Sequence, residues 1–227
     1  MNILFVVAHP DDEVLGAGAT IRKLVNEGNK VAVCTMANHA SARVNLSTSL
    51  KEDQKRAFEI MGVQNSYEGK FDNIKMNVVP HLDLVQFIEH AIEEWKAESI
   101  FTHHPTDTNN DHVMTSYAAQ AASRLFQRRE GIPPLKQFVY MEVPSSTEWS
   151  FDSSSNRFMP NMFVEIGKNG LETKLQALRA YSGVMRAYPH PRSDEAITGL
   201  AALRGAQSGC DYAEAFETVF NVDRIVK

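Results

Sequence analysis

Short runs of apolar residues, each bounded by polar ones, recur along the chain and indicate buried strands. The clearest are residues 2–8, 30–36, 98–102 and 138–143. Apolar side chains follow one another there with little alternation, which is typical of a parallel sheet covered on both faces. Weaker patterns suggest further strands near Tyr67, at 162–166 and at 216–222.

Segments with apolar residues every three or four positions separate these runs and predict helices. They cover residues 13–27, 50–61, 80–95, 113–127, 171–181 and 196–208. Gly28 stands where a glycine commonly ends a helix, and Pro80 suits a first helical position. A strand, a helix and a second strand in succession require a right-handed crossover between parallel strands. The pattern therefore predicts an α/β fold, with a mostly parallel sheet and helices on both faces.

Composition and charge narrow the class of protein. The 227 residues show no internal repeat or linker, so we expect one domain over residues 1–227. A net charge of −5 with scattered Lys and Arg argues against nucleic acid as a partner. No apolar run reaches the roughly 18 residues of a membrane span, and the apolar start lacks the basic residues of a signal peptide. Cys34 and Cys210 lie in unrelated contexts, as free thiols do, so we expect a cytoplasmic protein.

Two groups of polar side chains lie directly after apolar strands. The first holds His9 with the acids Asp11, Asp12 and Glu13, and the second covers residues 103–112. In open α/β sheets ligands bind outside the carboxyl ends of the strands, where both groups would lie. Three neighbouring carboxylates repel one another unless a positive charge separates them, and a divalent metal meets that need. The sequence therefore predicts a metal site at this end of the sheet.

The spacing of these residues suggests three metal ligands. A catalytic zinc takes three N or O ligands from the protein and keeps a fourth position for water. His9 and Asp12 lie three residues apart across a turn, and His112 is the best third ligand from another strand end. Asp111 could orient a ring nitrogen or hydrogen-bond within the site. Asp11, which is not needed as a ligand, would take a proton from water beside the metal.

A structural alternative is that Asp11 or Asp12 caps the following helix, where backbone N–H groups and the helix dipole favour acids. The second polar group, which ends in Asp111 and His112, argues against that explanation. Glu13 is expected at the start of the helix and not in the chemistry. Four other histidines are expected to face solvent or to have partners other than a metal, namely His39, His81, His103 and His104.

Several motifs together resemble those of one enzyme family. They are the segments 8–13, 102–105, 107–112, 188–193 and 213–216. In these motifs the chain is similar to the PIG-L/LmbE family of zinc-dependent N-acetylglucosamine de-N-acetylases. The resemblance implies a Rossmann-like α/β fold. It also implies that His9, Asp12 and His112 are the zinc ligands, and that Asp11 is the general base.

One position departs from the family pattern. Better-studied members carry a histidine three residues before the ligand histidine, where it is thought to stabilise the tetrahedral oxyanion. Asn109 occupies that position here. An amide can donate a hydrogen bond but cannot deliver a proton at neutral pH. We therefore consider two hypotheses: Asp11 serves as both base and acid, or His190 in a proline-flanked turn supplies the missing imidazole.

The reaction that the resemblance implies is hydrolysis of the N-acetyl group of a GlcNAc-type amino sugar or its conjugate, with release of acetate. Zn²⁺ is the expected cofactor, another divalent metal would also suit, and a small amino sugar is the expected partner. Loops at 37–49, with Arg43, and at 144–159, with Trp149, are expected to shape the pocket. The alternatives are a metal-dependent amidase acting on a non-sugar conjugate, and a non-catalytic protein that binds a metal or a sugar. A homo-oligomer is compatible with the sequence.

Overall fold

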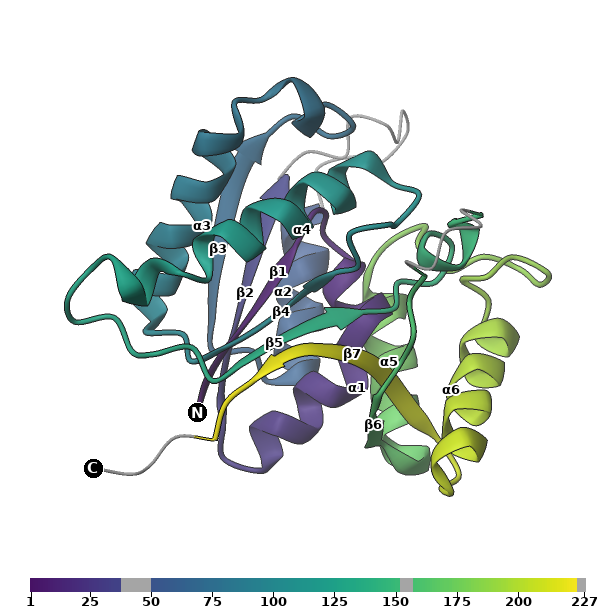
Figure 1. Ribbon diagram of the computed structural model, residues 1–227. Coiled ribbons are helices and arrows are strands. Elements are labelled where there is room, and N and C mark those ends of the chain that lie inside the picture. Colours follow the sequence, from purple (N-terminus) through teal and green to yellow (C-terminus); the bar gives the residue numbers. More distant parts are fainter. Residues whose placement is uncertain (38–49, 152–156, 224–227) are drawn as a thin grey trace.

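A seven-stranded sheet forms the centre of the protein, in the order β3-β2-β1-β4-β5-β7-β6 (Figure 1). The computed structural model describes residues 1–37, 50–151 and 157–223. The strands are β1 Asn2–Val7, β2 Lys30–Ala37, β3 Asn65–Phe71, β4 Ser99–His103, β5 Gln137–Met141, β6 Met162–Glu165 and β7 Ala213–Asn221. The helices are α1 Asp12–Asn26, α2 Leu50–Met61, α3 His81–Trp95, α4 Asn110–Ala122, α5 Gly167–Ala180 and α6 Asp194–Ser208, with short 3₁₀ turns η1 Met76–Val78, η2 Leu125–Gln127 and η3 Thr147–Trp149.

The strands from β3 to β5 are parallel to their neighbours, whereas β7 pairs antiparallel with both β5 and β6. The predicted mostly parallel sheet is therefore confirmed. The chain passes from β1 to β2 and β3 on one side and later returns to the other side of β1 through β4. Such a reversal of strand order opens a crevice at the carboxyl ends of the two central strands. His9 follows β1 and His112 follows β4, so both predicted polar groups lie at this crevice.

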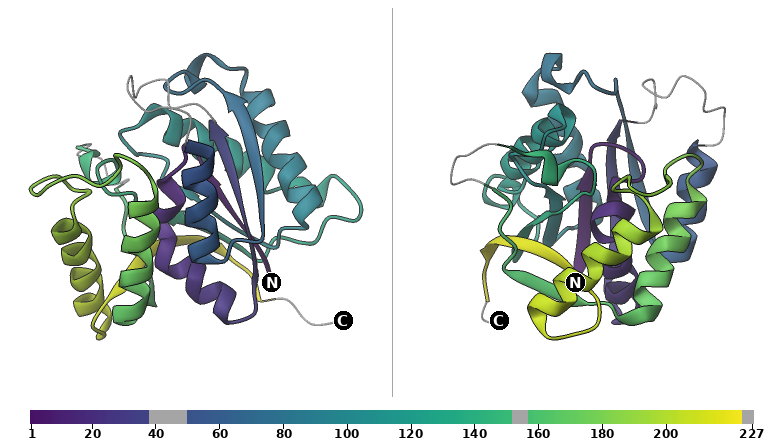
Figure 2. Two further views of the ribbon diagram at one scale, coloured as in Figure 1. Left: turned by 180° about the vertical axis from the view of Figure 1, so that it is seen from behind. Right: turned by 90° about the vertical axis from the view of Figure 1, so that its right-hand side faces the viewer.

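Helices cover both faces of the sheet, as predicted (Figure 2). Alternate residues of β1 point to opposite faces. Phe5 and Val7 pack in a core cluster with residues of α1, α2, α5 and α6. Leu4 and Val6 pack in a second cluster with residues of α3 and α4. This burial on both sides explains why the strand is an unbroken apolar run.

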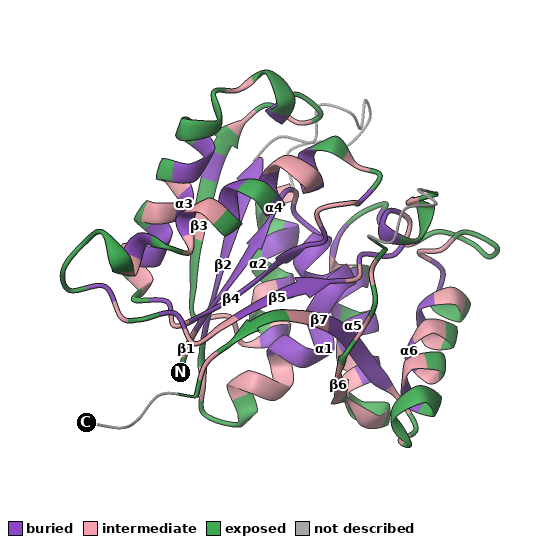
Figure 3. Cartoon of the chain, viewed as in Figure 1, coloured by how far each residue is buried: buried purple, intermediate pink, exposed green. Residues whose placement is uncertain are grey.

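Some predicted elements were misplaced, for local reasons. The strand expected near Tyr67 is the seven-residue strand β3, whose extent was not predicted because it is an edge strand with mostly exposed side chains and so lacks an apolar pattern (Figure 3). Helix α4 begins at Asn110, three residues before the predicted start at 113, because Oδ1 of Asn109 accepts the backbone N–H of Asp111 at 2.9 Å and caps the helix. His112 therefore lies within the first turn of α4.

Helix α1 is interrupted at Ala17, whose φ of −153° and ψ of 18° are not helical. The carboxylate of Glu214 in β7 accepts the N–H groups of Ala19 and Thr20 just beyond the interruption, at 3.3 and 2.7 Å. Lys174 of α5 pairs with the same carboxylate at 2.6 Å, and both partners are buried. The first turns of α1, which carry the acidic motif, are thus oriented separately from the rest of the helix.

Part of the expected pocket lies outside the described residues. Arg43 and His39 belong to residues 38–49, and the second expected loop includes residues 152–156. Within the described ranges, none of the helices combines the length and the apolar character that crossing a bilayer requires.

Candidate active site

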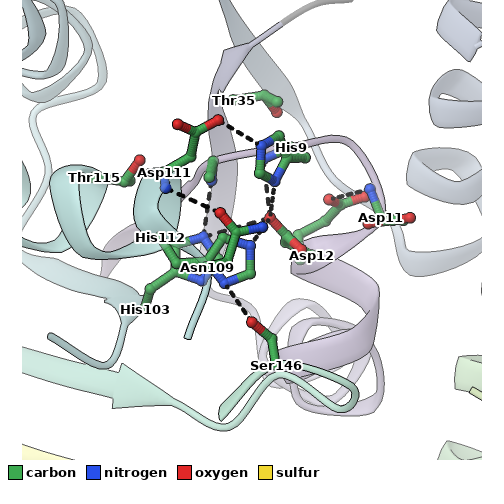
Figure 4. A network of polar contacts seen from close by, with 12 residues as sticks. His9, Asp11, Asp12, Thr35, His103, Asn109, Asp111, His112, Thr115 and Ser146 are labelled. Atoms are coloured by element: carbon green, nitrogen blue, oxygen red, sulfur yellow. Dashed lines mark hydrogen bonds and ion pairs between the residues drawn. The ribbon is translucent and has the colours of Figure 1, made fainter. Parts of the chain in front are cut away.

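Three predicted ligands come together where β1 and β4 end (Figure 4). Oδ2 of Asp12 lies 3.3 Å from Nδ1 of His9 and 3.2 Å from Nε2 of His112. Zinc–ligand bonds of about 2.0–2.1 Å in a tetrahedron place ligand atoms about 3.3 Å apart. Two imidazole nitrogens and a carboxylate oxygen are also the donor set of a catalytic zinc site. His9, Asp12 and His112 therefore fit a divalent metal in both chemistry and spacing.

Each of the two histidines uses its other ring nitrogen to contact a buried carboxylate. Nε2 of His9 lies 3.0 Å from Oδ2 of Asp111. The other carboxylate oxygen of Asp111, Oδ1, accepts the backbone N–H of Met76 at 3.0 Å. Nδ1 of His112 lies 3.1 Å from Oδ2 of Asp107. Such carboxylates fix the tautomer and orientation of a ligating imidazole. Asp111, for which the sequence suggested an orienting role, thus contacts the ring of His9.

Asp107 is a residue that the sequence analysis did not single out. Its carboxylate also accepts hydrogen bonds from the hydroxyls of Ser146 and Thr147, which lie 39 and 40 residues further along the chain. These contacts form only when the loop after β5 meets the loop after β4. The signal in the sequence was its place in the motif 107–112, five residues before His112.

The carboxylates dominate the electrostatics of the two candidate ligand histidines. Burial alone lowers the pKa of His9, but hydrogen bonds to Asp111 and Asp12 outweigh it and raise the pKa to about 9. Burial likewise lowers the pKa of His112, but Asp12 and Asp107 raise it to about 10. Burial raises the pKa of Asp12, yet His112 and His9 bring it well below its ordinary value. The cluster is thus built around negative charge that a bound cation would satisfy.

His103 lies in the same cluster but is poorly placed as a ligand. His103, Asp107 and His112 also lie close enough to one another to form a second group of ligand atoms. However, the rings of His103 and His112 stack 3.9 Å apart at 20°, so their in-plane lone pairs do not converge on one point. Nε2 of His103 already accepts the N–H of Ala8 at 2.8 Å. Burial lowers the pKa of His103 to about 3, so its ring is neutral.

Asp11 occupies the turn between His9 and Asp12 with a φ of 100°. Its side chain is almost fully buried, and its Oδ2 lies 3.2 Å from Nη1 of Arg192. The backbone N–H of Asp11 donates to Oε2 of Glu13 at 3.2 Å. Burial raises the pKa of Glu13 to about 8, so this carboxyl is mainly neutral at pH 7. Glu13 lies in the first turn of α1, as expected, and directly behind Asp11.

A cavity of about 180 Å³ opens over this cluster, lined among others by His9, Asp11, Asp12, Asn109, His112 and Arg192. Since Oδ1 of Asn109 caps α4, its NH₂ group is the end left to act as a donor. His190 is exposed and is not part of the cavity wall, and its Nδ1 accepts the backbone N–H of Arg192 at 3.0 Å. Arg192, which the sequence analysis placed only in a motif, lines the cavity instead.

The sequence model of the PIG-L family, described as GlcNAc-PI de-N-acetylase, matches residues 4–123. That range is more than half of the chain and includes His9, Asp11, Asp12 and His112. The chain belongs to the PIG-L family. The resemblance seen in the sequence motifs is therefore confirmed, and the protein is a member of a deacetylase family.

Known proteins similar to this member differ in the reactions that their names state. Uncharacterized deacetylase YaiS of Escherichia coli K12 is 24% identical over 185 residues, which cover 79% of this chain and 90% of that protein. The N,N'-diacetylchitobiose deacetylase of Pyrococcus horikoshii superposes with a TM-score of 0.78 at 18% identity, covering 96% of this chain and 83% of the other. GalB of Pseudomonas putida KT2440, a 4-carboxy-2-hydroxymuconate hydratase, gives 0.76 at 22% identity, covering 100% and 99%. The fold therefore hosts more than one reaction, and the reaction must be argued from the site.

Proposed function

We propose that this PIG-L protein is a metal-dependent hydrolase that removes the N-acetyl group from a GlcNAc-type amino sugar or its conjugate and releases acetate. The observation that carries the proposal is the convergence of His9 and His112 on one oxygen of Asp12, with Asp11 beside them on the cavity wall. These three ligands would hold the metal, and zinc is the metal whose donor set and spacing they match best.

The chemistry that a divalent cation supplies when bound there is polarisation of the amide carbonyl and a lower pKa for water. The chain's own residues would do the rest. Asp11 takes a proton from the attacking water as the water oxygen bonds to the carbonyl carbon. Asp11 later gives that proton to the amine nitrogen as the C–N bond breaks. The NH₂ group of Asn109 would donate a hydrogen bond to the carbonyl oxygen. Asp111 and Asp107 keep the two ligand rings in position.

The relatives support an amide substrate and a sugar. YaiS is named a deacetylase, and the Pyrococcus horikoshii protein acts, by its name, on N,N'-diacetylchitobiose. The donor set also favours catalysis over a structural role, because structural zinc is usually closed by four ligands and prefers cysteine. The three ligands found among the described residues include no cysteine and face a cavity.

The test is release of acetate from a panel of N-acetylated compounds. The panel holds N-acetylglucosamine, its 1-phosphate and β-linked conjugates, and N-acetylated amino acids as non-sugar amides. We expect acetate from the sugars only, loss of activity in chelator, and recovery when Zn²⁺ is restored. Acetate from the amino acids alone would favour the amidase alternative. Metal binding without acetate from any compound would favour the non-catalytic one.

His112→Ala serves as the matched negative control for this assay. It removes one ligand and should abolish both bound metal and acetate release. His104→Ala is the positive control, because its ring contacts Thr106 and Glu217 and it is not part of the cavity wall.

A further inference from the structure

Arg192 reaches the cavity from the connection between α5 and α6. Its Nη1 lies 3.2 Å from Oδ2 of Asp11, and its Nε donates to Oγ of Ser145 at 2.7 Å. The side chain is 18% exposed. Of the described residues on the cavity wall, it is the one lysine or arginine. A permanent positive charge is therefore fixed next to the proposed base.

One edge of this guanidinium is still available. A guanidinium is planar and holds its five N–H bonds in a rigid fork, so anchoring Nε and Nη1 also fixes the direction of the N–H bonds on Nη2. Nη2 has no hydrogen-bonding partner among residues 1–37, 50–151 and 157–223. Because Arg192 lines the cavity and is held by two acceptors, its Nη2 is available to donate a charge-assisted hydrogen bond to a ligand oxygen.

We propose that Nη2 of Arg192 binds the carbonyl oxygen of the scissile amide and stabilises the negative charge that develops on it. The proposal rests on the deacetylase function proposed above. It answers the question raised by Asn109, which is neutral where the family resemblance leads one to expect a histidine. His190 is exposed outside the cavity wall, whereas Arg192 lines it.

The position of Arg192 suits the movement of charge during the reaction. In the resting site its positive charge is paired with Asp11. When Asp11 takes the proton from water, its own negative charge is cancelled while negative charge appears on the carbonyl oxygen. Arg192 lies next to Asp11, and through Nη2 it would contact the carbonyl oxygen, so its interaction with that oxygen strengthens as negative charge develops in the transition state. Only such a gain accelerates the chemical step.

The experiment compares Arg192→Met and Arg192→Lys with Arg179→Met. Arg179 also pairs with an aspartate, Asp194 at 2.7 Å, but is not part of the cavity wall and serves as the matched control. For Arg192→Met we expect kcat to fall about 100-fold, as when one oxyanion donor is removed, with KM changed only a few-fold and zinc content unchanged. Arg192→Lys keeps the charge without the fork of N–H bonds, so its kcat should fall between those of Arg192→Met and the wild type. The kcat of Arg179→Met should equal that of the wild type.

A second readout separates a contact with the reacting atoms from a structural role. Added guanidinium ion at millimolar concentration should restore part of the kcat of Arg192→Ala and none of that of His112→Ala. The inference is overturned if Arg192→Met keeps its kcat and only KM rises, or if it loses zinc. If Arg192→Met does not fold, Arg192→Lys decides: a folded, zinc-containing variant with reduced kcat supports the inference, and one with wild-type kcat overturns it. A wild type that releases no acetate overturns the proposed function together with this inference, whereas an active wild type with an equally active Arg192→Met overturns the inference alone.

Discussion

The hydroxyl of Tyr181, at the end of α5, donates a 2.5 Å hydrogen bond to Oε1 of Glu13. Oε2 of the same carboxyl accepts the backbone N–H of Asp11 at 3.2 Å. All three residues are buried. A φ of 100° costs a residue other than glycine about 1–3 kcal/mol and persists only when its surroundings hold it. Glu13, which contacts Asp11 directly, and Tyr181, which holds Glu13, are among the surroundings that hold Asp11.

Tyr181→Phe should therefore weaken both stability and catalysis. The change leaves the buried carboxyl of Glu13 without one hydrogen-bond partner, which lowers the free energy of unfolding by about 1–3 kcal/mol. It also loosens Asp11, so kcat falls while bound metal stays the same. Urea unfolding, acetate release and metal analysis check these three results. Glu13→Gln is the milder control, because its amide can accept from Asp11 and donate to Tyr181; a larger loss in that variant than in Tyr181→Phe would contradict the explanation.

The pH dependence of stability should reveal the buried carboxyl of Glu13. Burial raises its pKa from 4.5 to about 8, so between these values the folded protein binds a proton that the unfolded chain does not. This group's contribution is thus complete below pH 4.5 and is lost as the pH rises through about 8. Subtracting the unfolding free energy of Glu13→Gln from that of the wild type should give a difference that declines across this range. A difference independent of pH would show that the carboxyl titrates normally.

Asp11 and Asp12 should separate cleanly by mutation. Asp11→Asn keeps the shape of the side chain but removes the base, so acetate release should fall by about 10²–10⁴ while metal content is unchanged. Asp12→Asn should lose the metal. Metal analysis beside acetate release distinguishes them. Metal loss in Asp11→Asn with retention in Asp12→Asn would mean that the two roles are exchanged.

Metal binding should release protons. The carboxylate partners raise the pKa of His9 to about 9 and that of His112 to about 10. In the metal-free protein at pH 7 both rings are therefore imidazolium cations, protonated on both nitrogens. A cation must displace about two protons, and its apparent affinity weakens as the pH falls. Calorimetric titration with Zn²⁺ in buffers of different ionisation enthalpy counts them. Heats that do not depend on the buffer would rule this out.

The buried pair of Lys174 and Glu214 should matter for stability and not for chemistry. Lys174→Met leaves the carboxylate buried with only backbone donors, which costs about 3–5 kcal/mol. Arg179→Met, which breaks an exposed pair, should cost only about 0–1 kcal/mol. Denaturant unfolding measures both. The kcat of folded Lys174→Met should equal that of the wild type, since the interruption at Ala17 separates this pair from the first turns of α1.

His190→Ala should leave acetate release unchanged. His190 is exposed, is not on the cavity wall, and contacts the backbone of Arg192 through one ring nitrogen. Its pKa is lowered by partial burial and by Arg192 and Arg186, so the neutral ring dominates at pH 7. Steady-state rates from pH 6 to 9 check the prediction. A selective loss of kcat would restore His190 as the proposed imidazole.

The parts of the fold that could be predicted are those whose burial is indicated by a local pattern of apolar residues. β1 is apolar on both faces because both faces are covered, and its pattern was sufficient. β3 was predicted less well because it is an edge strand, where the sheet's hydrogen bonds and not side-chain burial define the strand. The start of α4 depends on the single hydrogen bond from Asp111 to Asn109, which a periodicity of apolar residues does not report.

The site residues likewise fall into those that a local pattern indicates and those that depend on tertiary contacts. His9, Asp12 and His112 could be proposed because each belongs to a polar segment that follows a recognisable strand, and sheet topology brings strand ends together. Asp107 and Tyr181 depend on tertiary contacts with Ser146 and Glu13, and Arg192 depends on a contact with a residue 181 positions away. Nothing in the local pattern around these residues indicates those partners.

The distance in sequence between Arg192 and Asp11 has a practical consequence for engineering. The family model covers residues 4–123, and this part of the chain supplies all three candidate ligands. Arg192 belongs to the later connection between α5 and α6. That connection could be grafted from another member without touching a ligand. Chimeras of this kind would exchange part of the cavity wall while the three candidate ligands stay unchanged, and would show which properties of the site that connection determines.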